Sequence, residues 1–315
     1  MSAALPDYAI QLTNITKNYA GSTRRPAVQA LKNITLHVPR GSFFGLLGPN
    51  GAGKSTIINI MGQMVNKTSG RVEIWGINQE KNPRAAAASI GIVPQELNFD
   101  PFFTPEQLLD LQAGLYGVPK KQRKTQEILQ ALNLEDKAKS YARSLSGGMR
   151  RRLMVAKAMV HMPPILVLDE PTAGVDIELR KQLWDYMVAL NKQGVTIMLT
   201  THYLEEAQEL CDRIAIIHRG QIVANNTKTA LLGGLDSKEL IIRVAQPIMT
   251  APILLQPYHP KLSNPQERRL RYQPSKISMG ALLQKIQDAG LEIVDLSTIE
   301  PKLEDIFLSF TRSEP

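Results

Sequence analysis

The sequence predicts an α/β protein with a parallel sheet, an inserted helical block and a smaller α+β domain towards its carboxyl end. Short apolar runs at residues 165–168, 195–200 and 213–218 are typical of buried parallel strands, and stretches of helical pattern separate them. Residues 104–160 are helical in pattern, with Thr104 as the expected N-cap. After residue 234 prolines become frequent and the elements become short. This change in composition marks a second domain.

The order of elements gives expected domain boundaries. We place the large domain at residues 1–234, a helical subdomain within it at about 100–160, and a small accessory domain at 235–315. In the large domain, further strands are expected at 8–15, 31–38, 43–47, 72–75 and 90–93. In the small domain we expect strands at 239–244, 269–272 and 291–296 and helices at 278–289 and 303–310. No catalytic motif lies in the small domain.

Composition limits the classes of function. The formal net charge is +8, and the basic residues cluster at 24–25, 120–124, 150–152 and 268–271. We interpret each cluster as solvated surface. Cys211 is the only cysteine, which excludes an intrachain disulfide and a cysteine-rich metal site, and its surroundings predict a buried packing residue. No run approaches the ~18 apolar residues of a membrane span, and no secretion signal is visible. We therefore expect a soluble, cytoplasmic protein that reaches a membrane only through a partner.

Residues 48–56, Gly-Pro-Asn-Gly-Ala-Gly-Lys-Ser-Thr, fit the phosphate-binding loop pattern between a buried strand and a helix. The glycines let successive N–H groups point at anionic oxygens, and the helix adds its positive end. Lys54 is placed to reach the β- and γ-phosphates, and Ser55 to bind Mg²⁺. The motif predicts a bound nucleoside triphosphate. The expected contacts are Gly48, Asn50, Gly51, Ala52, Gly53, Lys54, Ser55 and Thr56.

Two carboxylates follow the apolar run at 165–168. Asp169 and Glu170 stand at the carboxyl end of a predicted strand, the edge at which ligands bind in open α/β sheets. Asp169 is expected to hold Mg²⁺ directly or through water, and Glu170 to polarise or deprotonate the attacking water. A capping pair at the strand end is the structural alternative, which the nearby phosphate loop makes the weaker interpretation.

A second anion site is predicted at residues 145–149, Leu-Ser-Gly-Gly-Met, which precede a helix. Ser146 is a natural N-cap, and Gly147 and Gly148 expose N–H groups at a positive helix end. One triphosphate does not need two cradles on one chain. Two copies arranged head to tail would each supply one cradle to each of two shared nucleotides. An ordinary loop leading into a helix is the alternative.

In this order the motifs resemble the nucleotide-binding subunit of ABC transporters, over residues of about 8 to 220. The resemblance implies a P-loop NTPase (RecA-like) core with an antiparallel β subdomain, an inserted α-helical subdomain, and ATP as the nucleotide. Residues 149–152, 173–180 and 301–308 are similar to the ABC-2-type, drug-resistance-like exporter branch.

The resemblance also implies roles for single residues. Tyr19 matches the aromatic residue that stacks on adenine, and Gln95 the glutamine that senses Mg²⁺ and water. Asp176 lies in the loop that crosses the dimer interface, and His202 matches the switch histidine at the γ-phosphate. Met149 stands where the family usually has Gln and cannot supply that side-chain contact. Taken alone, Tyr19 and His202 would be interpreted as packing residues.

We therefore expect an ATPase subunit that powers export through a separate transmembrane permease, present in two copies. Two ATPase chains form a homodimer, peripheral on the inner face of the cell membrane, and close over two ATP molecules. Lys54 of one chain and Ser146 of the other are expected to flank the same γ-phosphate. The catalytic residues are then Lys54, Glu170 and His202, and the Mg²⁺ ligands are Ser55, Gln95 and Asp169.

Two other functions fit part of the sequence. A soluble ABC-type ATPase acting on ribosomes or DNA would use the basic clusters, but no specific nucleic acid is expected, because such proteins carry two nucleotide-binding domains or a long coiled coil. A small-molecule P-loop kinase would leave the cradle at Ser146 unexplained. The small domain is expected to support the dimer or to regulate it. The cargo contacts would lie in the permease.

Overall fold

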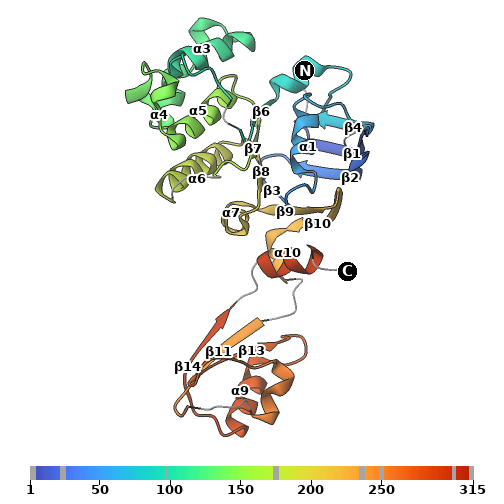
Figure 1. Ribbon diagram of the computed structural model, residues 1–315, viewed down its shortest axis with the longest axis vertical. Helices are drawn as coiled ribbons and strands as arrows, with labels where there is room; N and C mark the ends of the chain where they lie inside the picture. The colour runs from blue at the N-terminus through green and yellow to red at the C-terminus, as the bar shows by residue number, and fades with distance from the viewer. Residues whose placement is uncertain are drawn as a thin grey trace. The chain divides into compact units, whose positions relative to one another are not determined.

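The computed structural model describes residues 5–21, 26–96, 98–172, 177–233, 238–247, 252–299 and 303–311. The chain divides into two compact units, residues 1–228 and 229–315 (Figure 1). The expected boundary after residue 234 lies close to this division and stays a prediction. No helix in the described ranges combines the length and apolar character that a membrane span needs.

A six-stranded sheet forms the centre of the first unit. All neighbouring strands in it run parallel except the antiparallel pair at the β10 edge. In spatial order its strands are β10 (Gln221–Thr227), β9 (Arg213–His218), β3 (Phe43–Leu47), β8 (Thr196–Thr201), β7 (Ile165–Asp169) and β6 (Ile90–Val93). Strands β3, β7 and β8 are buried at every position, which explains why they appear in the sequence as continuous apolar runs.

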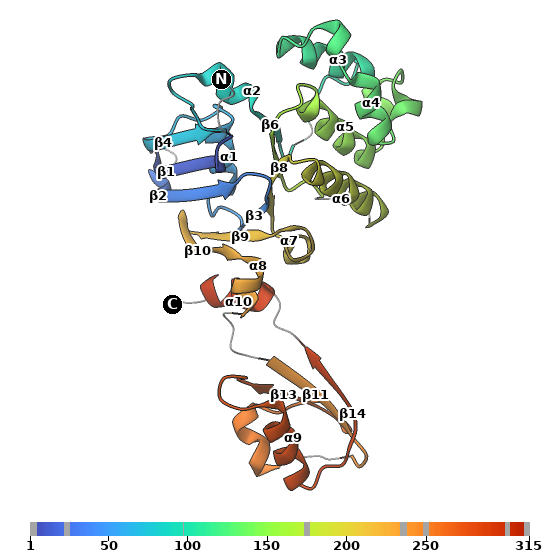
Figure 2. The same ribbon diagram turned by 180° about the vertical axis from the view of Figure 1, so that it is seen from behind.

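A second sheet is antiparallel and lies on one side of the central sheet, as Figures 1 and 2 show. Its order is β2 (Val28–Pro39), β1 (Tyr8–Tyr19), β4 (Ser69–Ile74) and β5 (Ile77–Asn78). One apolar core joins both sheets and helix α1 (Lys54–Met61), with Ile10, Ile57 and Val167 among its buried members. The helix that follows the phosphate loop is therefore fixed by burial between two sheets.

Helices α3 (Pro105–Leu115), α4 (Thr125–Ala131), α5 (Gly147–Met159) and α6 (Ile177–Lys192) form the other side of the first unit (Figure 2). Helix α2 (Pro83–Ala88) contacts β5 and β6 instead, and α7 (Leu204–Leu210) contacts β3 and β8. Single 3₁₀ turns lie at Lys120–Gln122, Glu135–Lys137 and Ala142–Ser144. Thr104 caps α3 in a reciprocal capping box with Gln107. Helices α3, α4 and α5 share a separate apolar core that includes Leu109, Leu129 and Leu153. The inserted helical subdomain expected from the sequence is present.

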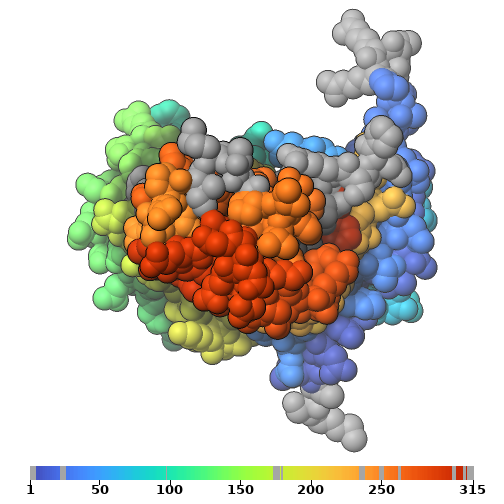
Figure 3. Space-filling model, turned by 90° about the horizontal axis from the view of Figure 1, so that it is seen from below, coloured from blue at the N-terminus to red at the C-terminus, as the bar shows by residue number. Residues whose placement is uncertain are grey.

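The second unit is a small α+β fold, coloured orange to red in the space-filling view (Figure 3). Its antiparallel sheet has the order β12 (Lys261–Asn264), β13 (Glu267–Tyr272), β11 (Lys238–Val244) and β14 (Ile293–Ile299). Its helical segments are α9 (Met279–Asp288), α10 (Leu303–Thr311) and the 3₁₀ segment Ile253–Tyr258, and α8 (Lys228–Gly233) spans the division between units. Leu240, Leu270 and Ile286 belong to its core. Arg268, expected on the surface, is instead buried at 1% exposure.

Candidate functional site

The phosphate loop connects β3 to α1 and has the backbone that its glycines permit. Gly51 and Gly53 adopt φ values of +80° and +113°, which side-chain-bearing residues rarely adopt. At Gly48 a Cβ atom would lie 2.4 Å from the carbonyl oxygen of Ile217, so only glycine fits against β9 there. Residues with a side chain would therefore strain the backbone at Gly51 and Gly53 and would clash with β9 at Gly48.

Lys54 begins α1 and is buried. Its Nζ donates to the carbonyl oxygens of Gly48 (2.6 Å) and Pro49 (3.2 Å), inside the loop. Burial lowers the pKa of the Lys54 ammonium, and the negative charges of Glu170 and Asp169 oppose that shift. A cation thus sits within the loop, between backbone carbonyls and the electrostatic field of two carboxylates.

The carboxylates lie at the end of β7, as predicted. Asp169 is buried, and its Oδ1 accepts a short hydrogen bond from the hydroxyl of Thr200 on β8. The next residue, Glu170, has a φ of +47°, in the left-handed region that residues with a Cβ seldom adopt. Its backbone N–H donates to the carbonyl oxygen of Thr200 at 3.0 Å. The turn after β7 is thereby tied to the neighbouring strand.

Three predicted site residues meet at the Glu170 carboxylate. Nε2 of Gln95, which follows β6, donates to Oε2 of Glu170 at 3.0 Å. Nδ1 of His202, which follows β8, lies 3.2 Å from Oε1 of the same side chain. Because β6, β7 and β8 are parallel, their carboxyl ends share one sheet edge. Both oxygens of Glu170 are consequently held by groups from the two flanking strands.

These side chains and the loop enclose a cavity of about 310 Å³. Its lining residues are Ala30, Asn50, Gly51, Gly53, Lys54, Ser55, Thr56, Gln95 and Glu170. Asp169 and His202 do not line it: Asp169 is buried and acts on Lys54 through its charge, and His202 contacts the lining residue Glu170. Among the described residues no three His, Cys, Asp or Glu side chains gather as a metal site. The donors near the cavity are the oxygens of Ser55, Gln95 and Asp169, a set that suits a hard cation completed by water and phosphate.

The second predicted cradle is well formed but lies elsewhere. Ser146 is the N-cap of α5, and its hydroxyl accepts from the backbone N–H of Met149 at 3.3 Å. A Cβ on Gly147 would meet no atom within 4 Å, so the space above this glycine is open. Neither Ser146 nor Gly147 or Gly148 lines the cavity at Lys54. The side chain of Met149 packs against the core of the helical subdomain, which gives this departure from the usual Gln a structural role.

Two further predicted contacts have different outcomes. Tyr19 ends β1, is 39% exposed and carries the Lys17 ammonium 4.6 Å from its ring centroid, but it does not line the cavity. The loop of residues 173–176, including Asp176, lies outside the described residues. The roles of Tyr19 and Asp176 therefore stay predictions.

The interpretation of residues 150–152 as solvated surface is wrong for two of the three arginines. Arg151 and Arg152 are only 5% and 6% exposed. Arg151 donates hydrogen bonds to backbone carbonyls after β6 and β7, and Arg152 to those of Leu132 and Asn133. The missed signal is helical spacing: Arg151 shares a helix face with the buried Met154 and Val155. Thr200 was also missed, although a polar residue in an apolar strand marked it.

The comparisons with known proteins agree with this geometry. Residues 31–173 match the family model described as ABC transporter. The linearmycin resistance ATP-binding protein of Bacillus subtilis is 33% identical over 96% of this chain and 98% of that protein. A daunorubicin resistance ATP-binding protein of Streptomyces coeruleorubidus is 33% identical over 98% and 97%. A Nod factor export ATP-binding protein of Rhizobium johnstonii is 33% identical over 99% and 98%.

Solved structures give the same result for the fold. An ATP-binding subunit of an ABC transporter superposes with a TM-score of 0.65 at 27% identity, covering 72% of this chain and 92% of that one. A dimeric ABC transporter cassette in a post-hydrolysis state, bound to ADP and Pi, superposes with a TM-score of 0.62 at 29% identity, covering 69% and 98%. Together with the loop at Lys54 and the carboxylates after β7, these likenesses show that the chain belongs to the ABC transporter family as an ATP-binding and ATP-hydrolysing subunit.

Proposed function

We propose that this subunit works as a homodimer in which each chain supplies half of each ATP site. The observation that carries the proposal is the separation of the two cradles. Lys54, Gln95 and Glu170 surround one cavity, whereas Ser146 caps α5 outside it, beside open space at Gly147. A second copy placed head to tail would bring its Ser146 to the γ-phosphate held at Lys54. The solved dimeric cassettes of similar fold support this arrangement.

Within one site, Glu170 is proposed as the general base that orients and deprotonates the attacking water. Gln95 and His202, which contact its two carboxylate oxygens, hold the carboxylate in place. Lys54 neutralises charge on the transferring phosphoryl group. Ser55, Gln95 and Asp169 provide the oxygen donors for Mg²⁺, which would neutralise the β- and γ-phosphates when bound.

Other predicted contacts complete the dimer. Tyr19 is proposed to stack on adenine, which its exposed ring at the end of β1 permits. Asp176 is proposed to cross the interface between the two chains. The small domain, proposed at residues 235–315, would support the dimer or regulate it. These assignments rest on the family resemblance.

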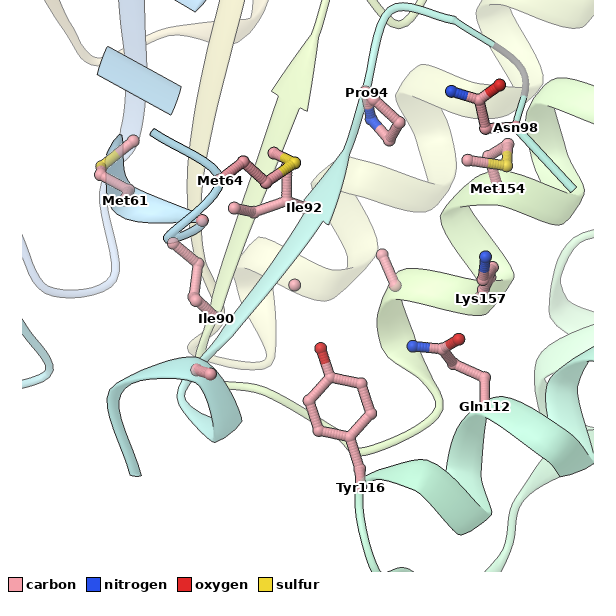
Figure 4. Close-up of a pocket in the computed structure, with 14 residues that line it drawn as sticks. Met61, Met64, Ile90, Ile92, Pro94, Asn98, Gln112, Tyr116, Met154 and Lys157 are labelled. Atoms are coloured by element: carbon pink, nitrogen blue, oxygen red, sulfur yellow. The ribbon is translucent and has the colours of Figure 1, made fainter. Parts of the chain in front are cut away.

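The partner is proposed to be a separate transmembrane permease in two copies, and its docking place a groove beside the Gln95 loop. The groove has a volume of about 370 Å³ and lies between the core and the helical subdomain. In Figure 4, Met64, Ile90 and Ile92 lie on one side, and Gln112 and Tyr116 on the other. Methionines adapt to the shape of a partner. An intracellular segment of the permease, apolar with a polar edge, would fit this lining.

This docking would hold the chain on the inner face of the cell membrane. It would also couple the groove to hydrolysis, because Pro94 lines the groove and the next residue, Gln95, contacts Glu170. Export is the proposed direction because the relatives are named resistance and export ATP-binding proteins. Those names also favour the transporter over an ATPase that acts on ribosomes or DNA.

Glu170→Gln tests the proposed chemistry. The substitution keeps the shape of the side chain but removes the base, so we expect steady-state ATP hydrolysis by the purified full-length chain to fall by about 10²- to 10⁴-fold. The Kd for ATP should stay within about twofold, because the phosphate loop is unchanged. Glu205→Gln, an exposed carboxylate on α7, is the matched control. Hydrolysis by Glu170→Gln at the control's rate would refute the role of Glu170.

A further inference from the structure

Arg151, near the start of α5, has all five of its guanidinium N–H groups bound to backbone carbonyl oxygens. Nε and Nη2 bind the loop after β7, and Nη1 binds the loop after β6. The acceptors are Pro94 (2.8 Å), Gln95 (2.9 Å), Asp169 (2.8 Å), Glu170 (2.6 Å) and Pro171 (2.7 Å). An arginine side chain has five N–H donors in a fixed planar arrangement, so Arg151 uses its full hydrogen-bonding capacity to hold two separate loops.

The surroundings of Arg151 oppose burial of its positive charge through desolvation and compensate for that burial through hydrogen bonds. The side chain is 5% exposed, and its five hydrogen-bond acceptors in the described part of the chain are all backbone carbonyls. Burial lowers the pKa of Arg151, while the charges of Asp169 and Glu170 raise it. A buried cation is tolerated when every donor is satisfied. Apolar residues could fill this position at lower cost, so the charge points to a task beyond packing.

That task is visible in the two loops. Glu170 has a φ of +47°, a left-handed backbone conformation that is unfavourable for a non-glycine residue. Arg151 binds the carbonyls before, at and after this residue, and so holds the strained turn. The same guanidinium binds the carbonyl of Gln95, whose amide lies 3.0 Å from the Glu170 carboxylate. One group therefore fixes the main chains of both partners in that contact.

We propose that Arg151 is a positioning residue for ATP hydrolysis, which clamps the Gln95 loop to the Glu170 turn and so sets the catalytic carboxylate. The proposal rests on the role proposed above for Glu170. It also ties the position of Glu170 to α5, the helix that Ser146 caps.

Arg152 provides a matched control in the same helix. It is as deeply buried as Arg151 and also binds backbone carbonyls, those of Leu132 (2.7 Å) and Asn133 (3.3 Å). These acceptors follow α4 in the helical subdomain and do not line the ATP cavity. A general effect of disturbing a buried arginine should appear at both positions, whereas a loss of positioning should appear only at Arg151.

The experiment compares Arg151→Lys with Arg152→Lys in the full-length chain, by ATPase kinetics, ATP binding and urea unfolding. A lysine ammonium has three donors at one point and cannot span two loops. We expect Arg151→Lys to lower kcat by about 10- to 100-fold, with the Kd for ATP within about twofold because Lys54 and its loop are untouched. Arg152→Lys should unfold at lower urea yet keep kcat within about twofold of wild type.

A double-mutant cycle with Gln95→Ala separates positioning from a structural role. If Arg151 acts by aligning Gln95 with Glu170, the two losses in kcat should be less than multiplicative. Should Arg151→Lys fail to fold, Arg151→Gln, which removes the buried charge, takes its place in the same cycle. Equal losses of kcat at Arg151 and Arg152, or fully multiplicative losses with Gln95→Ala, would overturn the proposal. Retained activity in Glu170→Gln would instead overturn the proposed role of Glu170.

Discussion

We predict how much the free energy of unfolding falls in Thr200→Val, a substitution that removes one buried hydroxyl next to Asp169. Thr200 is fully buried on β8, and its hydroxyl donates to Oδ1 of Asp169. The main-chain bond from the N–H of Glu170 to the carbonyl of Thr200 does not depend on the side chain. Valine has nearly the same shape, so the substitution takes away the donor to a buried carboxylate, together with a longer contact of 3.3 Å in which the hydroxyl accepts from the Glu170 N–H. A hydrogen bond to a charged group contributes about 1.5–3 kcal/mol, and we expect a loss of that size.

The assay can report the first unit alone. Both tryptophans of the chain, Trp75 and Trp184, belong to residues 1–228, so urea unfolding followed by tryptophan fluorescence measures that unit. Thr196→Val is the control: it is equally buried on the same strand, but its hydroxyl accepts from the neutral N–H of Gly41 at 2.9 Å. We expect it to lose about 0.5–1.5 kcal/mol and to keep its Mg²⁺ dependence.

Thr200→Val should also need more Mg²⁺ for half-maximal ATP hydrolysis, because the Asp169 carboxylate loses the hydroxyl donor that orients it. Destabilisation equal in the two variants, with an unchanged Mg²⁺ requirement in Thr200→Val, would show that the hydroxyl does not serve Asp169.

Two other predictions concern acid stability and the shared site. Burial lowers the pKa of His161, and its hydrogen bond to the Ile90 carbonyl only partly opposes this shift. Because the unfolded chain then takes up the proton at a higher pH than the folded chain, the free energy of unfolding should fall as the pH drops below about 6.5. His161→Phe should make the urea midpoint depend less on pH between pH 7.5 and 5.5. A steeper profile in the variant would contradict the sign. Mixing Lys54→Ala with Ser146→Arg, each inactive alone, should restore hydrolysis to at most about a quarter of the wild-type rate. Half of the dimers are mixed and hold one intact site, and a rate below a quarter would mean that this site depends on the defective one. No recovery after exchange of chains would argue that each site is built within one chain.

The buried strands and the phosphate loop could be predicted from the sequence because short stretches of residues determine their structure. The buried strands were evident because a parallel strand covered on both faces needs apolar residues throughout. The loop at Lys54 was evident because glycines at φ +80° and +113° have few substitutes. Gln95 and His202 were assigned through the family resemblance, and the structure gives the reason that they meet at Glu170: strands β6, β7 and β8 are parallel and end at one edge.

What sequence reasoning missed depends on tertiary contacts. The charge of Arg151 suggested a surface residue. Helical spacing alone places it on a buried face, but only the folded chain shows the five backbone carbonyl oxygens that it binds. Arg268 was misplaced for a different reason: its neighbours Arg269 and Arg271 are exposed, but strand alternation turns Arg268 to the buried face. The carbonyl partners of Arg151 lie far away in the chain, whereas Arg268 binds the nearby carbonyls of Asn264 and Glu267. In both cases backbone carbonyls accept from a buried guanidinium, and a cluster of charged residues in the sequence does not show this.

The same tertiary contacts connect the two cradles. Ser146 caps α5, and Arg151 lies just over one turn further along the same helix. The guanidinium fixes the turn at Glu170 and the loop at Gln95, whose side chains meet at 3.0 Å. A rigid helix cannot move its cap without moving the residue one turn away. A γ-phosphate that bound Ser146 of one chain would therefore bias, through Arg151 of that chain, the carboxylate of its own cavity. Each site in the proposed dimer would then sense whether the other is closed.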